Sequence, residues 1–382
     1  MTEQLKLKLN DSKATRWGAL VIVAFTMMAA YYVNDVVAPL KTMLETDLAW
    51  SSTDFGFFTG GYSFLNVFFL MLIWGGLILD RFGIRFTGKL ATILMVGGTA
   101  LEYYAMTGLA GADATLFGIN EIFGYKTGVF VAFAGYSIFG VGAEVAGITV
   151  SKIIAKWFKG KELATAMGVQ VALARIGSQA GYAVAIPLAR AFGISTPVLL
   201  GLVLLLGGMI AFFIFAVMDK KLDKQMEAAA IAAGTEDEEE KFSFKDVKNI
   251  LVNPGFWLIA LLCVLFYSCV FPFQKFASEL MIIKYGINEN VAGTFAGLPA
   301  LGALILTPVF GGFIDKRGKS ASIMLLGSAM LICVHFIYAI PDINYWLVAI
   351  VLMIILGIAF SLVPSAMWPA VAKIFPVRSE EH

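Results

Sequence analysis

The sequence predicts an all-α protein that crosses a membrane many times, and three observations support this. Hydrophobic residues make up 59% of the chain and charged residues only 14%, which is too few polar side chains to cover a soluble protein of 382 residues. The mean hydropathy is +0.83. The apolar residues also form blocks long enough to cross a hydrocarbon core, which needs about 20 residues per helix.

Ten such blocks can be distinguished, and each is expected to form one transmembrane helix. They cover approximately residues 16–40, 54–78, 88–110, 126–151, 162–189, 195–218, 255–280, 291–313, 321–340 and 344–368. The first is too long for a cleavable signal peptide and lacks a cleavage pattern. If the N-terminus lies in the cytoplasm, most of the 28 lysines and arginines fall on that side, which is the usual bias of membrane proteins. We therefore expect a cytoplasmic N-terminus.

A change in composition divides the chain into three parts. Residues 219–248 are rich in both charges and contain an acidic run at 236–240, which is typical of a mobile linker. The expected parts are a six-helix bundle (1–218), a cytoplasmic linker (219–254) and an incomplete bundle of four helices (255–382). Within the linker, residues 242–251 fit a short helix on the membrane surface and an ordinary solvated loop equally well.

One loop motif occurs twice, each time after a long apolar block. Both copies have the pattern Gly-x-x-x-Asp-(Arg/Lys)-x-Gly, and their residues, with a further arginine in the first copy, are Gly76, Asp80, Arg81, Gly83, Arg85, Gly311, Asp315, Lys316 and Gly318. Internal duplication of this kind is a common build of secondary transporters. A duplicated six-helix unit should have twelve helices, so we expect a fragment or truncated product that lacks the last two.

The residues of the motif suggest a mechanical role at a cytoplasmic gate. Gly76 and Gly83 would allow close approach to a neighbouring helix and a sharp turn. Asp80 would accept hydrogen bonds from helix termini or pair with an arginine across the interface between the halves. Arg81 and Arg85 would anchor the loop at anionic headgroups. Simple anchoring of the topology by positive charge is the alternative.

Two opposite charges inside the apolar blocks predict a binding site. A charge within a membrane helix is costly unless it faces a cavity or a partner. Glu144 lies in the block 126–151 and Arg175 in the block 162–189, and antiparallel neighbours would place both near the middle of the bilayer. Such a pair can bind the ammonium and carboxylate groups of a zwitterion. A structural salt bridge is the alternative, and the two roles can coexist.

Other embedded polar residues are less specific candidates. Lys275 is a second handle for a substrate carboxylate, although its side chain can also snorkel to the interface. Gln170, Tyr62 and Trp368 could supply hydrogen bonds or apolar walls, but each is more often ordinary packing.

Glu102 and Asp35 are candidates for a proton-carrying site. A carboxyl group buried in apolar surroundings can exchange a proton during transport. The alternative is that both face a wetted outer vestibule.

Several chemistries are absent from the sequence. It has no GxxxxGK[ST] nucleotide loop, and its two histidines and three cysteines form no metal-ligand or CxxC pattern. No serine, histidine and acid combination suggests hydrolysis. We therefore expect no enzyme activity, no catalytic residue, no metal and no cofactor, and the net charge of +1 gives no sign of a nucleic-acid partner.

These residues carry a resemblance to a known family. The loop around Asp80 resembles the signature of the major facilitator superfamily. Residues 157–163 (Trp-Phe-Lys-Gly-Lys-Glu-Leu) and 174–178 (Ala-Arg-Ile-Gly-Ser) are similar to its lysosomal dipeptide transporter branch. So are residues 356–363, the Met-Trp-Pro at 367–369, and Asp35 with Pro39.

The resemblance implies two pseudo-symmetric six-helix bundles, alternating access and uniport of dipeptides. It also implies that Glu144 and Arg175 hold the termini of the peptide. Animal members need a glycosylated accessory subunit, and nothing in this sequence shows a surface for one. The N-terminal segment lacks an acidic dileucine sorting signal, so lysosomal delivery is not expected. Because the segments expected on the outer side lack glycosylation sites, a bacterial cytoplasmic membrane is expected instead.

Three functions remain open at this point. The first is transport of small zwitterions, most simply dipeptides or short peptides, between the two faces of a lipid bilayer. The second is proton-coupled transport of another small organic ion or metabolite. The third is a non-transporting membrane sensor or scaffold.

Overall fold

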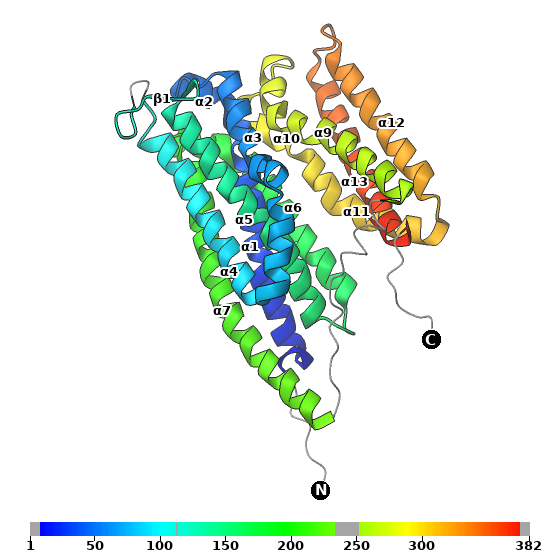
Figure 1. The fold of residues 1–382 in the computed structure, drawn as a ribbon. Coiled ribbons are helices and arrows are strands. Elements are labelled where there is room, and N and C mark those ends of the chain that lie inside the picture. Colours follow the sequence, from blue (N-terminus) through cyan, green and yellow to red (C-terminus); the bar gives the residue numbers. More distant parts are fainter. Residues whose placement is uncertain (1–7, 112–113, 234–251, 375–382) are drawn as a thin grey trace. The chain divides into compact units, whose positions relative to one another are not determined.

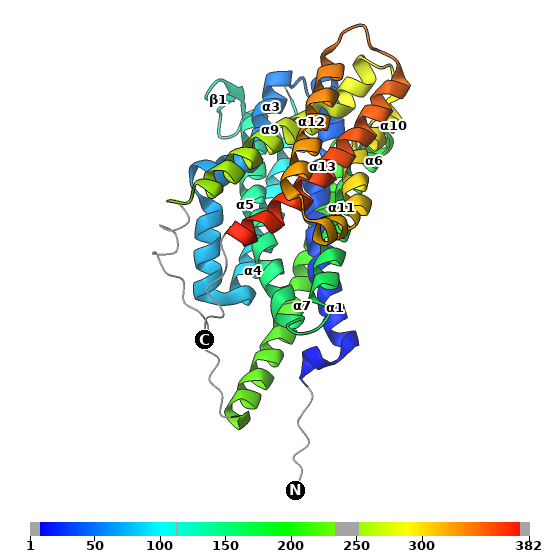
Figure 2. The same ribbon diagram turned by 90° about the vertical axis from the view of Figure 1, so that its right-hand side faces the viewer.

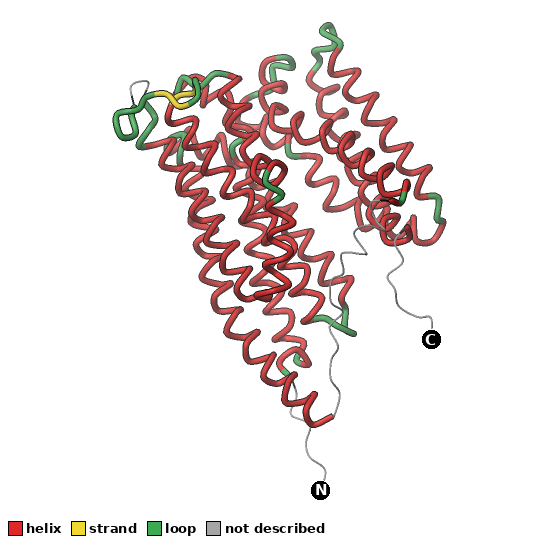
Figure 3. Tube along the Cα trace, viewed as in Figure 1, coloured by secondary structure: helices red, strands yellow, loops and turns green. Residues whose placement is uncertain are grey.

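The structure, a computed structural model, describes residues 8–111, 114–233 and 252–374 and divides into two compact units, Met1–Glu236 and Asp237–His382. Helices dominate both units, and the strands described form one short hairpin (Figure 3). The N-terminal unit contains η1 (Leu9–Asp11), α1 (Lys13–Val36), η2 (Ala38–Leu40), α2 (Lys41–Asp47), α3 (Ser52–Phe68), α4 (Met71–Thr107), β1 (Glu121–Ile122), β2 (Tyr125–Lys126), α5 (Thr127–Trp157), α6 (Leu163–Phe192) and α7 (Thr196–Ala233) (Figure 1). The C-terminal unit contains α9 (Pro254–Ile283), α10 (Glu289–Ala296), α11 (Leu298–Arg317), α12 (Ser320–Ala339) and α13 (Trp346–Ile374).

This architecture confirms the expected all-α membrane protein. Among the described residues, seven helical segments are long and apolar enough to cross a membrane, or eight if the pair α3 and α4, bent by 58°, forms one span. The expected blocks 54–78 and 88–110 remain separate, because α4 turns at Gly83 (φ 74°) and only its part after this residue corresponds to the second block. The first breaks at Phe69 and Leu70, where Leu70 has φ 52°, and its remainder continues into α4. The α6 helix, which carries glutamines and arginines, falls outside the set of apolar spans.

The segment 219–233, expected as the start of a linker, is helical. It forms the end of α7, which runs from Thr196 to Ala233 as one helix (Figures 1 and 2). The prediction differed because charged residues such as Asp219 and Asp223 are typical of a solvated loop. In the structure both pair with basic side chains of neighbouring helices. The acidic run at 236–240 and the segment 242–251 lie outside the described residues.

Close packing of α4 on α5 forms the centre of the N-terminal unit. A Cβ atom added at Gly98 would lie 2.4 Å from the backbone oxygen of Gly135, and one added at Gly135 would lie 2.7 Å from the oxygen of Gly98. Facing glycines of this kind allow two helix backbones to approach each other in a membrane. Around this pair, α5 also packs on α3, and α1 packs on α6 and α7.

In the C-terminal unit, α13 packs against both α11 and α12, as Figure 2 shows. One core cluster consists of Ile314, Ile323, Leu362 and Ala366. Near the N-terminal end of α11, a Cβ atom at Gly302 would lie 3.1 Å from the Cα of Gly357, so α11 and α13 also meet through glycines.

Candidate functional site

Glu144 is held by a hydroxyl group from another helix. Its side chain is partly buried on α5, and its Oε1 accepts a hydrogen bond of 2.8 Å from the Tyr62 hydroxyl on α3. Gly140, one turn before Glu144, makes this possible, because a Cβ atom there would lie 2.3 Å from the Tyr62 carbonyl oxygen. Because Gly140 has no side chain, α3 and α5 can approach each other closely at the depth of Glu144.

Arg175 faces an aromatic ring at the contact of α6 with α1. Its guanidinium carbon lies 5.7 Å from the centroid of Tyr31, within the range of a cation–π interaction. Glycine again sets the approach, because a Cβ atom at Gly177 would lie 2.1 Å from the carbonyl oxygen of Met28.

The electrostatic surroundings of Tyr31 include both predicted charges. Both Glu144 and Arg175 lie close enough to its hydroxyl to interact with it electrostatically, and so does Asp35. The ion pairs within 4.0 Å that the structure describes for this unit join other residues and do not link Glu144 to Arg175. A tyrosine side chain therefore lies beside each of the two charges, and their joint role in one binding site stays a prediction.

A second polar group lies beside this site. The Tyr136 hydroxyl on α5 donates to the backbone oxygen of Asn34 at 2.7 Å, and the Asn34 side chain donates to Asp35 Oδ1 at 2.8 Å. Glu102 on α4 is fully buried and acts electrostatically on the same Tyr136 hydroxyl. The Tyr136 ring also packs against Tyr62, with centroids 5.7 Å apart. Asp35 and Glu102 are thus connected to the Glu144 site through tyrosines.

Sequence reasoning missed Tyr31 and Tyr136 and treated Tyr62 as an ordinary wall. A signal was present, because a tyrosine within an apolar helix usually seeks a partner for its hydroxyl. Gln170 is partly buried on α6. Lys275, partly buried on α9, and Trp368, 54% exposed on α13, belong to the C-terminal unit. The binding roles of these last three residues remain predictions.

The first loop motif makes contacts that differ from those expected. Gly83 has φ 74° and produces the turn, whereas a Cβ atom at Gly76 would meet nothing within 4 Å, so the close approach expected of Gly76 was wrong. Asp80 pairs with Lys152 of α5 at 2.9 Å, within the same unit. Arg81 is exposed, with its guanidinium above the neighbouring Phe82 ring.

Arg85 does not serve as the expected headgroup anchor. It binds Asp219 at 3.3 Å and also Asp223, both on α7. Asp219 is fully buried and accepts two further bonds, from Lys156 at 2.8 Å and from the Trp157 indole at 3.0 Å. This acidic cluster ties α4, α5 and α7 together. The prediction failed because α7 was expected to end before these carboxylates.

The second copy of the motif keeps the turn but shows fewer contacts. Gly318 has φ 66° and ends α11. Lys316 is exposed, and a Cβ atom at Gly311 would meet nothing within 4 Å. The side chain of Asp315 lies outside the described residues, so its expected gate contact stays a prediction.

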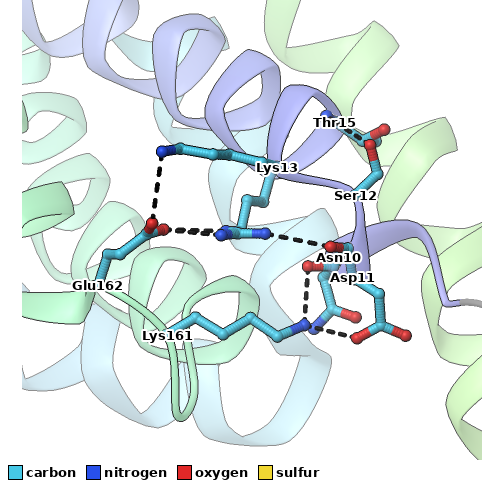
Figure 4. Close-up of polar contacts among 8 residues, drawn as sticks. Asn10, Asp11, Ser12, Lys13, Thr15, Lys161 and Glu162 are labelled. Carbon is cyan, nitrogen blue, oxygen red and sulfur yellow. Dashed lines mark hydrogen bonds and ion pairs between the residues drawn. The ribbon is translucent and has the colours of Figure 1, made fainter.

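A group of ion pairs at the start of the chain, which we call the N-terminal clasp, joins η1 and α1 to the turn between α5 and α6 (Figure 4). Lys161 pairs with Asp11, and Glu162 pairs with Arg16 at 2.8 Å and with Lys13 at 3.7 Å. The hydrogen bond from Lys161 lowers the pKa of Asp11 below its ordinary value. The bond from Arg16 lowers the pKa of Glu162 in the same way. Both carboxylates therefore stay ionised in mildly acidic conditions.

Comparisons with known proteins were made with this geometry in view. The human lysosomal dipeptide transporter MFSD1 is 28% identical over 377 residues, which cover 95% of this chain and 74% of the relative. The orang-utan (Pongo abelii) and chicken (Gallus gallus) proteins of the same name are 28% and 32% identical over 371 and 255 residues, covering 94% and 63% of this chain and 72% and 54% of the relatives. These relatives are animal proteins named lysosomal, so they do not support the expected bacterial membrane.

Solved structures and a family model agree on the fold. A D-xylose–proton symporter superposes with a TM-score of 0.61 at 16% identity, covering 94% of this chain and 83% of the symporter. A bacterial homologue of the human peptide transporters PepT1 and PepT2 superposes with a TM-score of 0.64 at 13% identity, covering 94% and 84%. At such identities the likeness shows the fold alone. The family model described as Major Facilitator Superfamily matches residues 20–380, and this chain is therefore a member of the major facilitator superfamily of membrane transporters.

Proposed function

We propose that this transporter moves small zwitterionic substrates, most simply dipeptides or short peptides, by alternating access. The observations that carry the proposal are the hydrogen bond from the Tyr62 hydroxyl to Glu144 and the position of the Arg175 guanidinium beside the Tyr31 ring. The names of the relatives at 28 to 32% identity support the same substrate class.

The chemistry of the site suits the two ends of a peptide. The carboxylate of Glu144 would bind the α-ammonium group, while the planar fork of Arg175 would bind the α-carboxylate through two parallel hydrogen bonds. The hydrogen bond from Tyr62 orients the glutamate before the substrate arrives. Because a zwitterion neutralises both side chains at once, it offsets the cost of holding two charges at membrane depth.

The loop motif supplies one contact that can break during rocking and one that persists. In the Asp80–Lys152 pair the side chains are 60% and 48% exposed, and exposed pairs contribute only about 0 to 1 kcal/mol. The cluster on Asp219 is buried and has several partners. We assign gate control to Asp80, which becomes available when this weak pair breaks, and a structural role to the cluster on Asp219.

The N-terminal clasp fits a cytoplasmic position for the N-terminus. Lys13, Arg16 and Lys161 all lie at the same end of the N-terminal unit, and cytoplasmic segments are enriched in such residues. Cysteine labelling at Lys13 from either side of sealed vesicles tests this orientation. If an impermeant reagent added outside sealed vesicles that keep the cytoplasmic face inside labelled this cysteine, a cytoplasmic N-terminus would be contradicted.

One observation favours a second candidate, proton-coupled transport. The path from Glu102 through Tyr136 and Asn34 to Asp35 reaches the edge of the Glu144 site. Uptake that depends on a pH gradient, and loses that dependence in Glu102→Gln, would favour coupling. Uptake at the same rate with and without the gradient would favour uniport.

Chemically modified peptides test which residue binds which end. Thermal unfolding of the purified protein would be followed with Ala-Ala, N-acetyl-Ala-Ala and Ala-Ala-amide. A ligand that binds only the folded state stabilises it, by about 2.7 kcal/mol at a ligand concentration of 100 times Kd, and therefore raises the Tm. The wild type is expected to respond to the free dipeptide much more than to either blocked form.

The variants sharpen this assignment. Glu144→Gln should lose the discrimination against the N-acetyl form, and Arg175→Gln the discrimination against the amide. Glu121→Gln, at an exposed position of the same unit, is the matched control. A Tm that rises equally with free and blocked peptides would refute the assignment, and so would a response unchanged in both variants. Uptake of labelled Ala-Ala into vesicles containing the protein then separates transport from binding alone.

A further inference from the structure

Two tight turns of the same sequence pattern lie between α4 and α5. Residues 116–119 read Leu-Phe-Gly-Ile and residues 122–125 read Ile-Phe-Gly-Tyr. In the first turn the two end residues exchange both backbone hydrogen bonds at 3.0 Å, and in the second they pair as part of β1 and β2. We call residues 116–126 the Phe-Gly hairpin.

Both turns place a phenylalanine where the backbone disfavours it. Phe117 and Phe123 have φ 54° and 53°, and the glycine after each has φ 81°. Positive φ at both central positions is the requirement of a type I′ turn, which prefers asparagine before glycine. An aromatic residue there is uncommon and its backbone is strained.

The same two rings are also exposed. Phe117 is 95% exposed and Phe123 is 88% exposed, so neither gains the burial that would offset its strain within this unit. Two strained turns that each present a ring to the surroundings suggest that the rings are buried in something outside the protein.

Contacts with the rest of the N-terminal unit hold the Phe-Gly hairpin in place. The Tyr125 ring stacks on Phe57 of α3 with centroids 3.9 Å apart and planes 8° apart. Lys126 Nζ donates to the Ala49 carbonyl oxygen at 2.6 Å, and the Thr127 amide donates to the carbonyl oxygen of Asn120 at 2.9 Å. The exposed rings are therefore held in place by contacts with α3 and the start of α5.

The position of the hairpin in the N-terminal unit indicates what its exposed rings contact. Figure 1 shows the hairpin at the edge of the N-terminal unit, beyond the ends of α4 and α5 and at the end of the unit opposite η1. The last turns of α4 expose Leu101 and Tyr104, apolar side chains that face lipid in a membrane-spanning helix. A segment that follows such a surface is expected at the level of the headgroups, where membrane proteins carry belts of aromatic residues.

We propose that the Phe-Gly hairpin inserts Phe117 and Phe123 into the interfacial layer of the leaflet on the side opposite the N-terminus. The insertion fixes the depth of the ends of α4 and α5 in the bilayer. The strain of the two turns is compensated by transfer of the two rings from water to the interface.

Site-directed fluorescence tests the insertion. In a variant with the three cysteines, Cys263, Cys269 and Cys333, replaced by serine, Phe117→Cys and Phe123→Cys would carry a polarity-sensitive dye in phosphatidylcholine vesicles. Quenching by a shallow spin-labelled lipid is expected to exceed that by aqueous iodide several-fold, with the reverse at the control Asn120→Cys. Labels at both phenylalanine positions that are quenched mainly by iodide would overturn the proposal and indicate a protein partner instead.

A second variant separates the rings from the turn. Phe117→Asn combined with Phe123→Asn keeps the type I′ geometry and removes both rings, so the Tm in detergent should be unchanged or higher. A dye on Thr115→Cys should then lose its shallow-lipid quenching several-fold relative to the parent. Unchanged quenching in the folded double variant would show that the phenylalanines do not hold the hairpin on the leaflet.

Discussion

The glycine contact between α4 and α5 allows a sharp test with two adjacent residues. A Cβ atom at Gly98 would lie 2.4 Å from both the oxygen of Gly135 and the backbone nitrogen of Phe139. Ordinary contact begins near 3.4 Å, so Gly98→Ala forces the two helices apart by about 1 Å. Gly97, one position earlier, has nothing within 4 Å of its Cβ position, and Gly97→Ala is the matched control.

The expected difference follows from packing and propensity. Overpacking of a well-packed interior costs about 1 to 3 kcal/mol, and here the contacted atoms belong to the backbone and cannot rotate away. Gly97→Ala keeps the interior unchanged and gains up to about 1 kcal/mol of helix propensity. Gly98→Ala gains the same helix propensity, so the two variants should differ by the overpacking cost alone, about 1 to 3 kcal/mol.

Thermal unfolding in detergent measures this difference. A domain of this size shifts its Tm by about 2 to 4 °C per kcal/mol, so Gly98→Ala should unfold about 2 to 12 °C below Gly97→Ala. The wild type should lie between them or close to the control. Equal Tm values for the two variants would show that α4 and α5 are not in backbone contact at this point.

Three further results are expected. Asp219→Asn removes the charge that neutralises a buried cluster and should lower stability by about 3 kcal/mol, more than Asp223→Asn, whose side chain is 40% exposed; equal losses would contradict the assigned burial. Tyr62→Phe removes a hydrogen bond to the charged Glu144, worth about 1.5 to 3 kcal/mol, and should raise the Kd for Ala-Ala by about tenfold or more, which calorimetry would measure. Glu162→Gln should lower the Tm at neutral pH. The pKa of Glu162 is lower in the folded than in the unfolded state, so the ionised carboxylate stabilises the fold above the ordinary carboxyl range, and this stabilisation is lost as pH falls through the folded pKa. The Tm difference between Glu162→Gln and the wild type should therefore close only below about pH 4. A gap that closes near pH 6 would refute the lowered pKa.

The class of protein and the turns of the two loop motifs, at Gly83 and Gly318, could be predicted from the sequence because hydropathy and glycine conformation are local properties. Apolar blocks of sufficient length mark the helices wherever they pack, and Gly83 adopts its positive φ within the loop motif itself. Glu144 and Arg175 could also be singled out, since a charge inside an apolar block is conspicuous without any knowledge of its neighbours.

The partners of these residues were decided by the tertiary structure. Tyr62 reaches Glu144 across 82 positions of the chain, and Arg85 reaches Asp219 across 134. Between two adjacent glycines, Gly75 lies against Val145 while Gly76 faces open space. Sequence spacing indicates which residues share a helix, but the crossing point and rotation of each helix determine which side chain meets which neighbour. For that reason the charges of the site were visible in the sequence, and the tyrosines that join them became visible only in the fold.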